Sequence, residues 1–163
     1  MQEVIQDINN WLNEDKNIAL ATVVQTWGSA PRKVGAKMAL TPDGGISGSV
    51  SGGCVEGAVF EEGSHALEIS KAKLLHFGVA DETAWDVGLA CGGIIEVFVQ
   101  ELNTAVYHHM QHLIENDIAG ATITIIQGPD KLLGNQLAVA RGGAPVGTLG
   151  NVKLDKLAIE AEQ

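Results

Sequence analysis

The sequence GGISGSVSGGCVE, residues 44–56, runs from a glycine-rich turn directly into a predicted helix over 55–70. Glycine adopts positive φ angles and lets the backbone approach a ligand or a neighbouring strand closely. A loop of this kind gathers unpaired N–H groups and the positive end of the helix dipole at one point, which favours a bound phosphate or another anion. Cys54 lies at that point. The segment therefore predicts an anion site beside a thiol, although close packing of a glycine-rich turn explains the same residues.

Strands and helices alternate on both sides of this loop. Apolar residues at helical spacing predict the helices, and β-branched runs between turn residues predict the strands. The helices are predicted over 2–14, 55–70, 104–116 (with Thr104 as its N-cap) and 153–162, and the strands over 18–26, 37–41, 46–49, 73–77, 94–102, 121–127, 136–141 and 145–149. The second and third strands, and likewise the last two, are expected to pair as hairpins. The pattern predicts an α/β or α+β fold with a mixed sheet, and no repeat of fixed period is expected.

Length and composition predict one globular domain. The 163 residues, 45% of them hydrophobic, are enough for one well-packed core, so residues 1–163 are expected to form a single domain. The formal net charge of −10, with basic residues scattered beyond the pair at 32–33, argues against a nucleic-acid partner. The acidic N-terminus lacks a secretory signal, and no apolar run reaches membrane-spanning length. A cytoplasmic protein with free thiols is therefore expected.

The two cysteines have similar neighbours, since Cys54 follows Gly-Gly and Cys91 precedes Gly-Gly. Two thiols in glycine-rich loops favour convergence of the loops on one site, whereas a small buried side chain is the usual role of an unpaired cysteine. The cysteines do not by themselves predict a zinc site, because zinc needs four ligands and Cys-x-x-Cys is missing. His108 and His112 have a metal-binding spacing, yet an exposed polar helix face explains them as well.

Hydroxyl groups and charges adjoin the loop. Ser49 and Ser51 add donors to those of the backbone. Arg32 is expected either to close over an anion or to lie as an ordinary solvated cation. Glu56 is either a first-turn carboxylate that the helix dipole favours or a general base, and the first explanation needs fewer assumptions.

The stretches ATVVQTWGSAPRKVGAKMALTPDGGISGSVSGGCVEGAV, residues 21–59, and GLACGGIIEVFVQEL, residues 88–102, contain three motifs in order. The motifs are GSAPRKVGAKM, GSVSGGCVE and LACGG. Over about residues 18–102 the chain resembles the N-terminal domain of the XdhC/CoxI family. Longer members continue into a Rossmann-like domain, which is not expected within 1–163. Residues 103–163 carry no motif with an assigned role.

The resemblance implies an accessory protein that binds molybdenum cofactor (molybdopterin) as cargo. Such proteins help to mature and insert the sulfurated cofactor into molybdenum hydroxylases such as xanthine dehydrogenase and carbon monoxide dehydrogenase. A chaperone rather than an enzyme is expected, and no catalytic residue is assigned. The implied partners are the client enzyme and a cysteine desulfurase, and a homodimer is the common default for the oligomeric state.

On this resemblance, the expected cofactor site consists of Arg32, Ser49, Ser51, Gly52, Gly53, Cys54, Cys91 and Gly92. Backbone N–H groups of 51–54, with Arg32, are expected to hold an anionic part of the cofactor. Cys54 and Cys91 are expected to contact its molybdenum or to take part in transferring the sulfido ligand. Two alternatives stay open, a thiol–disulfide redox protein that uses both cysteines and a non-catalytic interaction module with a purely structural loop.

Overall fold

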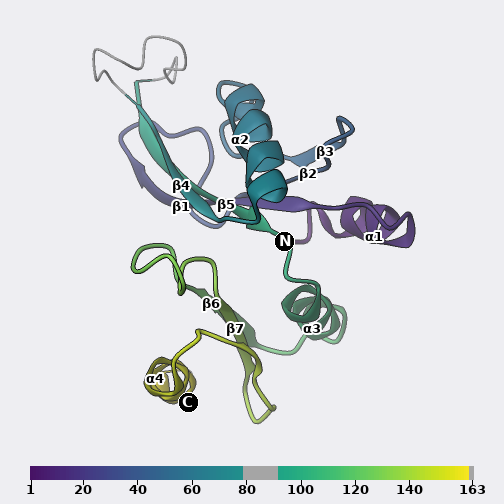
Figure 1. Ribbon diagram of the computed structural model, residues 1–163, viewed down its shortest axis with the longest axis vertical. Helices are drawn as coiled ribbons and strands as arrows, with labels where there is room; N and C mark the ends of the chain where they lie inside the picture. Colours follow the sequence, from purple (N-terminus) through teal and green to yellow (C-terminus); the bar gives the residue numbers. More distant parts are fainter. Residues whose placement is uncertain (79–91, 162–163) are drawn as a thin grey trace. The chain divides into compact units, whose positions relative to one another are not determined.

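The computed structural model describes residues 1–78 and 92–161 (Figure 1). The chain divides into two compact units, Met1–Glu101 and Leu102–Gln163, each with its own sheet. The expectation of a single domain stays a prediction, because compactness alone does not distinguish one domain in two parts from two domains. In the described part of the chain, no helix has the length and apolar character needed to cross a membrane.

The first unit contains a five-stranded sheet in the order β3-β2-β1-β5-β4. Its strands are β1 Ala19–Trp27, β2 Lys37–Leu40, β3 Ile46–Gly48, β4 Lys73–Phe77 and β5 Ile94–Glu101. β1 is central because its first residues form a nearly continuous apolar run that is buried on both faces.

Two helices complete the first unit. α2, Glu56–Ile69, lies across one face of the sheet, against β5, β1 and β2 (Figure 1). Gly63 faces Leu40, where a β-carbon would lie 2.7 Å from Leu40 Cδ2, so this glycine permits the close approach of helix and sheet. α1, Ile5–Asn13, is joined to β3 by a hydrogen bond from Ser47 Oγ to Asp7 Oδ2. Residues 49–55 connect β3 to α2 and form the cysteine loop.

The second unit has a three-stranded sheet in the order β6-β7-β8. In the sequence, one helix precedes these strands and one follows them. Its elements are α3 Thr104–Glu115, β6 Gly120–Thr124, β7 Gln136–Ala140, β8 Val146–Thr148 and α4 Val152–Ala161. A small core forms around Leu137, Val139 and Leu149, against which Ile123 and Ile159 pack.

The predicted fold class, helices packed on β-sheet, is confirmed, as are both hairpins. Every strand pair in the described residues is antiparallel, however, whereas the sequence predicts a mixed sheet. The reason is that α2 carries the chain from β3 at one edge of the sheet to β4 at the other, so no helix connects two neighbouring parallel strands. The N-cap of α3 is Asn103 rather than Thr104, because Asn103 Oδ1 accepts a hydrogen bond from Val106 N.

The second unit repeats the arrangement of the first five elements of the chain. The elements α1, β1, β2, β3 and α2 correspond in order to α3, β6, β7, β8 and α4. In both sheets the strand that comes second in the repeat pairs with the first and the third. From that strand onward, counterparts lie 99 positions apart, as Gly48 and Gly147 do. Strands β4 and β5 have no counterpart in the described part of the second unit.

Individual hydrogen bonds are repeated as well. Lys37 Nζ donates to Thr22 Oγ1 over 2.9 Å, and at the equivalent place Gln136 Nε2 donates to Thr124 Oγ1 over 3.1 Å. The backbone bond from Gly35 N to Val23 O has its counterpart in the bond from Gly134 N to Ile125 O, and both measure 2.8 Å.

Glycine is required at one equivalent position of each copy. Gly48 and Gly147 have φ angles of 76° and 90°, and a β-carbon would lie 2.3 Å from the carbonyl oxygen of Lys37 or Gln136 respectively. The sequence shows no repeat of fixed period, and this correspondence of two backbone paths is visible only in the structure. The two copies share few residue types, because what is retained is a backbone path fixed by a few glycines and polar contacts.

Candidate functional site: a cysteine loop at the start of a helix

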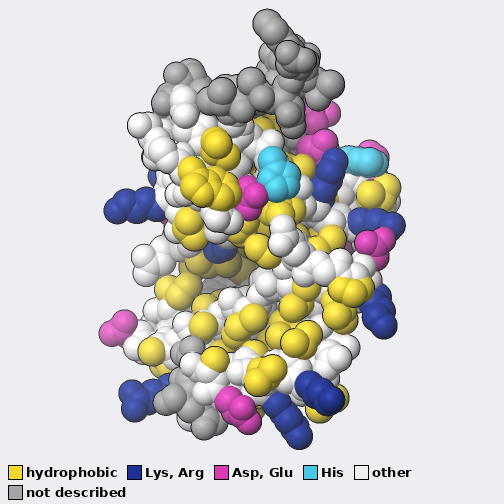
Figure 2. Space-filling view, turned by 90° about the vertical axis from the view of Figure 1, so that its left-hand side faces the viewer, with side chains coloured by type: hydrophobic (Ala, Val, Ile, Leu, Met, Phe, Trp, Pro, Cys, Tyr) yellow, Lys and Arg dark blue, Asp and Glu magenta, His cyan; other side chains and the backbone are white. Residues whose placement is uncertain are grey.

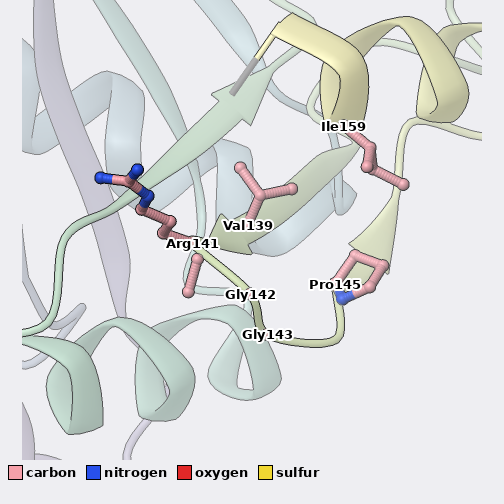
Figure 3. Close-up of a pocket in the computed structure, with 7 residues that line it drawn as sticks. Val139, Arg141, Gly142, Gly143, Pro145 and Ile159 are labelled. Carbon is pink, nitrogen blue, oxygen red and sulfur yellow. The ribbon is translucent and has the colours of Figure 1, made fainter. Parts of the chain in front are cut away.

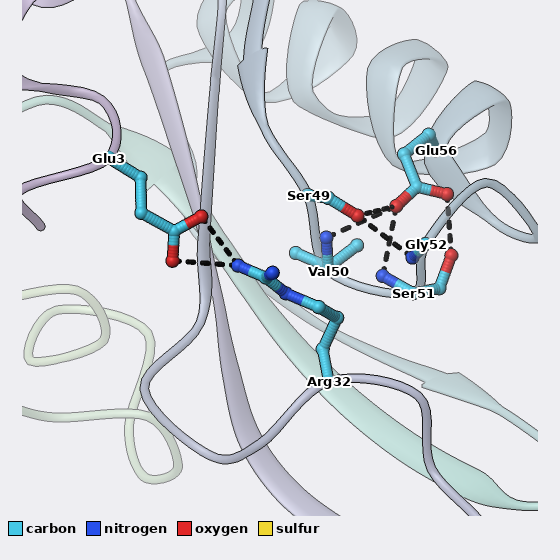
Figure 4. A network of polar contacts seen from close by, with 7 residues as sticks. All are labelled: Glu3, Arg32, Ser49, Val50, Ser51, Gly52 and Glu56. Atoms are coloured by element: carbon cyan, nitrogen blue, oxygen red, sulfur yellow. Dashed lines mark hydrogen bonds and ion pairs between the residues drawn. The ribbon is translucent and has the colours of Figure 1, made fainter.

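The cysteine loop closes around the carboxylate of Glu56, the first residue of α2 (Figure 4). Oε1 accepts hydrogen bonds from Ser49 Oγ (2.6 Å) and from the backbone nitrogens of Val50 (3.2 Å) and Ser51 (2.9 Å). Oε2 accepts from Ser51 Oγ and from the backbone nitrogen of Gly53 (2.8 Å). Several donors from the seven residues that precede Glu56 thus converge on one carboxylate.

The two serines extend this network to the rest of the loop. Ser49 Oγ accepts from the backbone nitrogen of Gly52 (2.8 Å), and Ser51 Oγ accepts from that of Val55 (2.9 Å). Burial of Glu56 opposes its ionisation, but the hydrogen bonds from Ser49, Ser51 and the backbone outweigh burial and lower the pKa of Glu56 to about 2. Glu56 is therefore ionised at neutral pH and too weak a base for proton abstraction, which supports the first-turn carboxylate over the general base.

This geometry bears on the expected anion site. The backbone N–H groups of Ser51 and Gly53 already donate to a carboxylate within the chain, and that of Gly52 donates to Ser49 Oγ. The sequence predicts the nest of N–H groups, but not its occupation by Glu56. The sequence signal that could have indicated this role of Glu56 is the spacing of two serines and a carboxylate at a helix start, which resembles a capping box.

Cys54 is exposed, so a small buried side chain is excluded for this cysteine. Gly52 and Gly53 hold the backbone at φ angles of 77° and 119°, which keeps the loop out of helical conformation until Glu56. In the repeated copy the position of Cys54 is taken by Lys153, which already lies within α4. The two glycines therefore account for a difference between the copies. The first copy has a loop that exposes a thiol, whereas in the second copy the helix begins earlier.

The three sequence motifs meet through the segment of residues 28–31. A β-carbon on Gly52 would lie 3.9 Å from Pro31 Cβ, so this segment adjoins the cysteine loop. On its other side, a β-carbon on Gly93 would lie 2.8 Å from the backbone of Ser29, a distance that only glycine permits. Gly92, which also belongs to the expected site, has a φ of 72° and open space beside it. Cys91 lies outside the described residues, so its distance from Cys54 stays a prediction.

Arg32 directly follows the segment of residues 28–31 and is paired within the chain. Its Nη2 contacts both carboxylate oxygens of Glu3, at 2.7 and 2.6 Å (Figure 4). The Glu3 side chain is 53% exposed, so this ion pair is accessible to water and exchangeable. Trp27 of β1 pairs with Ile94 of β5, and the two residues are 44% and 38% exposed. They form an apolar rim beside residues 28–31.

The described residues contain no cluster suited to a metal ion. Among residues 1–78 and 92–161, no group of three or more His, Cys, Asp or Glu side chains is placed to hold a metal ion. His112 Nδ1 lies 3.1 Å from Asn116 Nδ2 on the exposed side of α3. On the face that Figure 2 shows, the Lys and Arg side chains of the described residues are separated by other side chains and form no single patch.

A hollow lies in the second unit, at the β7–β8 hairpin (Figure 3). Val139, Pro145 and Ile159 give it apolar walls, whereas the Arg141 guanidinium extends away from Pro145 and Ile159. This hollow offers mainly apolar surface, unlike the donor-rich cysteine loop.

The fold and the site define a small α/β protein with a cysteine-bearing glycine loop at a helix start. Residues 11–78 match the family described as "XdhC and CoxI family". The resemblance carried by the motifs is thereby confirmed over residues 11–78.

Relatives with curated descriptions agree with this family match. The chain is 32% identical over 117 residues to a probable xanthine dehydrogenase subunit from Bacillus subtilis, covering 71% of this chain and 36% of that protein. It is 35% identical over 95 residues to "Molybdenum cofactor insertion chaperone PaoD" of Escherichia coli, covering 58% of this chain and 29% of that protein. The chain thus spans about a third of the length of these relatives.

A solved structure has the same fold. A chain from Bacillus halodurans, described as a xanthine dehydrogenase, superposes with a TM-score of 0.67 at 19% identity, over 88% of this chain and 44% of that one. The coverage includes most of both units, so the likeness is not confined to residues 11–78.

Proposed function

We propose that this protein handles molybdenum cofactor and supports its delivery to a molybdenum hydroxylase. The observation that carries the proposal is the exposed Cys54 in a loop that adjoins residues 28–31, in a chain similar to a protein described as a molybdenum cofactor insertion chaperone. A molybdenum hydroxylase client follows from the same names. A cysteine desulfurase as a second partner, and a role in sulfuration, stay predictions.

The residues fit a bulky, anionic, sulfur-rich cargo in three respects. Cys54 offers a soft thiol ligand at the surface. A β-carbon added to Gly53 or Gly92 would have no atoms within 4 Å, so the backbone is open to close approach there. Arg32 supplies a positive charge whose present partner is mostly exposed. The expected site is Arg32, Ser49, Ser51, Gly52, Gly53, Cys54, Cys91 and Gly92.

We assign the roles within this site with the observed contacts as a guide. Ser49 and Ser51 hold Glu56 and so fix the loop, rather than binding the cargo directly. Cys54, with Cys91 if the loops converge, contacts the molybdenum side of the cargo. Arg32 exchanges Glu3 for an anionic group of the cargo, because an exposed ion pair contributes little stability and is easily replaced.

The test is a titration of the purified protein with molybdenum cofactor, followed by activation of a cofactor-free molybdenum hydroxylase. Cys54→Ala and Cys91→Ala are compared with Glu61→Ala, an exposed position on α2. We expect the cysteine variants to bind the cofactor at least tenfold more weakly and to lose activation, with Glu61→Ala unchanged. Unaltered binding and activation in both cysteine variants would contradict the proposal.

A thiol–disulfide redox protein is the alternative that exposed Cys54 also permits. Mild oxidation distinguishes it, because a redox pair forms one intramolecular disulfide only if the two Cα atoms lie within roughly 7 Å. Reversible formation of this bond, together with no affinity for the cofactor, would favour the redox protein.

A further inference from the structure

Two groups of the candidate site that could bind an anion are occupied by carboxylates of the chain itself. Backbone N–H groups of the cysteine loop donate to Glu56, and the Arg32 guanidinium is paired with Glu3. Both glutamates therefore lie where an anionic group of a cargo would have to bind. The two contacts differ in strength, and this difference decides which carboxylate a cargo can replace.

The Glu56 carboxylate is a fixed part of the loop. It accepts hydrogen bonds from two serine hydroxyls and from three backbone nitrogens, and the pKa of Glu56 is lowered to about 2 as a result. An incoming anion would have to replace all of these charge-assisted bonds at once. Displacement of Glu56 by a cargo is therefore not expected.

The Glu3 carboxylate, in contrast, has a single donor. Both of its oxygens contact one nitrogen of Arg32, Nη2, which is turned toward Glu3 in Figure 4. Within residues 1–78 and 92–161, Nε and Nη1 of Arg32 have no hydrogen-bond partner, so the guanidinium keeps donors for another anion. A phosphate-like group can accept from two guanidinium nitrogens at once, and such bidentate pairs are among the strong ones.

The backbone beside Glu3 is held against the first sheet. Val4 is fully buried, and a β-carbon on Gly48 would lie 2.7 Å from Val4 Cγ1, so Val4 packs on the last residue of β3, directly before the cysteine loop. Asp7 accepts a hydrogen bond from Ser47 Oγ of the same strand. The segment that carries Glu3 is thus fixed at two points, while the Glu3 side chain itself stays about half exposed.

A carboxylate fixed in this way acts on Arg32 at a high effective concentration. An anion that needs Nη2 can bind only in the fraction of molecules in which Glu3 has turned away, so the measured affinity of every such anion is lowered by the same factor. For an exposed ion pair of ordinary strength this factor is about two- to sixfold.

We propose that Glu3 is an internal competitor for the anion site of Arg32 and sets how strongly an anion must bind before it displaces the carboxylate. A phosphate-like dianion, which can bind two guanidinium nitrogens, meets this requirement better than a singly charged carboxylate. The inference rests on the proposed function for the nature of the cargo, whereas the competition itself concerns Glu3 and Arg32 alone.

The test follows the side-chain N–H resonance of Arg32 by NMR while inorganic phosphate is added to the full chain at low ionic strength. Glu3→Gln should bind phosphate about two- to sixfold more tightly than the natural chain. Glu3→Asp keeps the charge but is one methylene shorter, so it should also bind phosphate more tightly, because its carboxylate falls short of Nη2. Glu61→Gln, at an exposed position on α2, removes the same charge elsewhere and should leave the affinity unchanged.

Three outcomes would each overturn the proposal. They are a gain in Glu3→Gln no larger than in Glu61→Gln, an unchanged affinity in Glu3→Asp, and an Arg32 resonance that phosphate does not shift in any variant.

A second arm titrates molybdenum cofactor into the natural chain and Glu3→Gln, and the variant should again bind more tightly. Equal affinity for the cofactor in both chains would overturn competition between Glu3 and the cargo. If neither chain binds the cofactor while phosphate behaves as expected, the proposed function fails and the competition at Arg32 stands.

Discussion

At the scale of single residues, Glu56 is the residue on which the cysteine loop depends. Glu56→Gln keeps the shape of the side chain but removes the charge that the donors from Ser49, Val50, Ser51 and Gly53 require. We expect a loss of about 2 kcal/mol in the free energy of unfolding, the usual range for charge-assisted hydrogen bonds. Urea denaturation measures it, with Glu61→Gln on the same helix as the control. A loss no larger than that of the control would contradict this role.

The same residue predicts a dependence of stability on pH. The pKa of Glu56 in the folded protein, about 2, lies below its ordinary value of 4.5. Its contribution is therefore complete above about 4.5 and is lost as the pH falls toward 2. The difference in unfolding free energy between the natural chain and Glu56→Gln should shrink over that window. A difference that stays constant from pH 6 to pH 2.5 would contradict the lowered pKa.

Gly53 and Gly57 make a matched pair for the backbone of the loop. Gly53 has a φ of 119° and open space beside it, so Gly53→Ala is strained only through its backbone, by about 1–3 kcal/mol. Gly57 lies in α2 with open space as well, and Gly57→Ala should stabilise the helix by up to about 1 kcal/mol. Thermal unfolding of both variants checks the opposite signs. Equal effects would mean that the φ angle of Gly53 does not matter.

At the scale of elements, the packing of α2 on β2 depends on Gly63 and Leu40. A β-carbon on Gly63 would lie 2.7 Å from Leu40 Cδ2, so Gly63→Ala should cost about 1–3 kcal/mol by overpacking. Leu40→Ala alone leaves a cavity and should cost about 2–5 kcal/mol. In the double variant the new methyl group enters space that Leu40 has vacated. The loss of unfolding free energy in the double variant should therefore be smaller than the sum of the losses in the two single variants. Strict additivity in a double-mutant cycle would contradict the contact.

The elements themselves were largely predictable. The strands at 73–77 and 18–26 follow from β-branched and apolar runs, and both hairpins follow from glycine-rich turns between such runs. The antiparallel character of the sheet was not predictable, because it depends on α2 crossing to the far edge, which is a matter of topology rather than of local pattern.

The candidate site was predictable only in part. The glycine loop and Cys54 follow from local chemistry, and the family resemblance joined them to Gly92. The pairings of Glu56 with the loop and of Arg32 with Glu3 were missed, because each depends on where a long side chain turns in three dimensions. The segment of residues 28–31 was likewise not expected to connect the motifs, since the close approach of Gly93 to Ser29 joins residues far apart in the sequence.

At the scale of the whole molecule, the two units have separate cores and equivalent loop contacts. In the second unit Asp155 takes the place of Glu56, since Oδ1 accepts from Leu149 N and Oδ2 from Thr148 Oγ1, both over 2.7 Å. Glu56→Gln should therefore speed amide exchange mainly within residues 1–101, and Asp155→Asn mainly within 102–161. Hydrogen exchange with mass spectrometry resolves the two regions. Equal acceleration in both units by either variant would show that they unfold as one.

The carboxylate of Glu56 has a consequence for the thermodynamics of any encounter at the cysteine loop. Ordering a flexible loop around a ligand costs conformational entropy that reduces the affinity. Here the backbone around Cys54 is already held by bonds within the chain, before a ligand arrives and after it leaves. A ligand that contacts the thiol can therefore depart without the loop having to refold, which suits a site that must both accept a molecule and give it up.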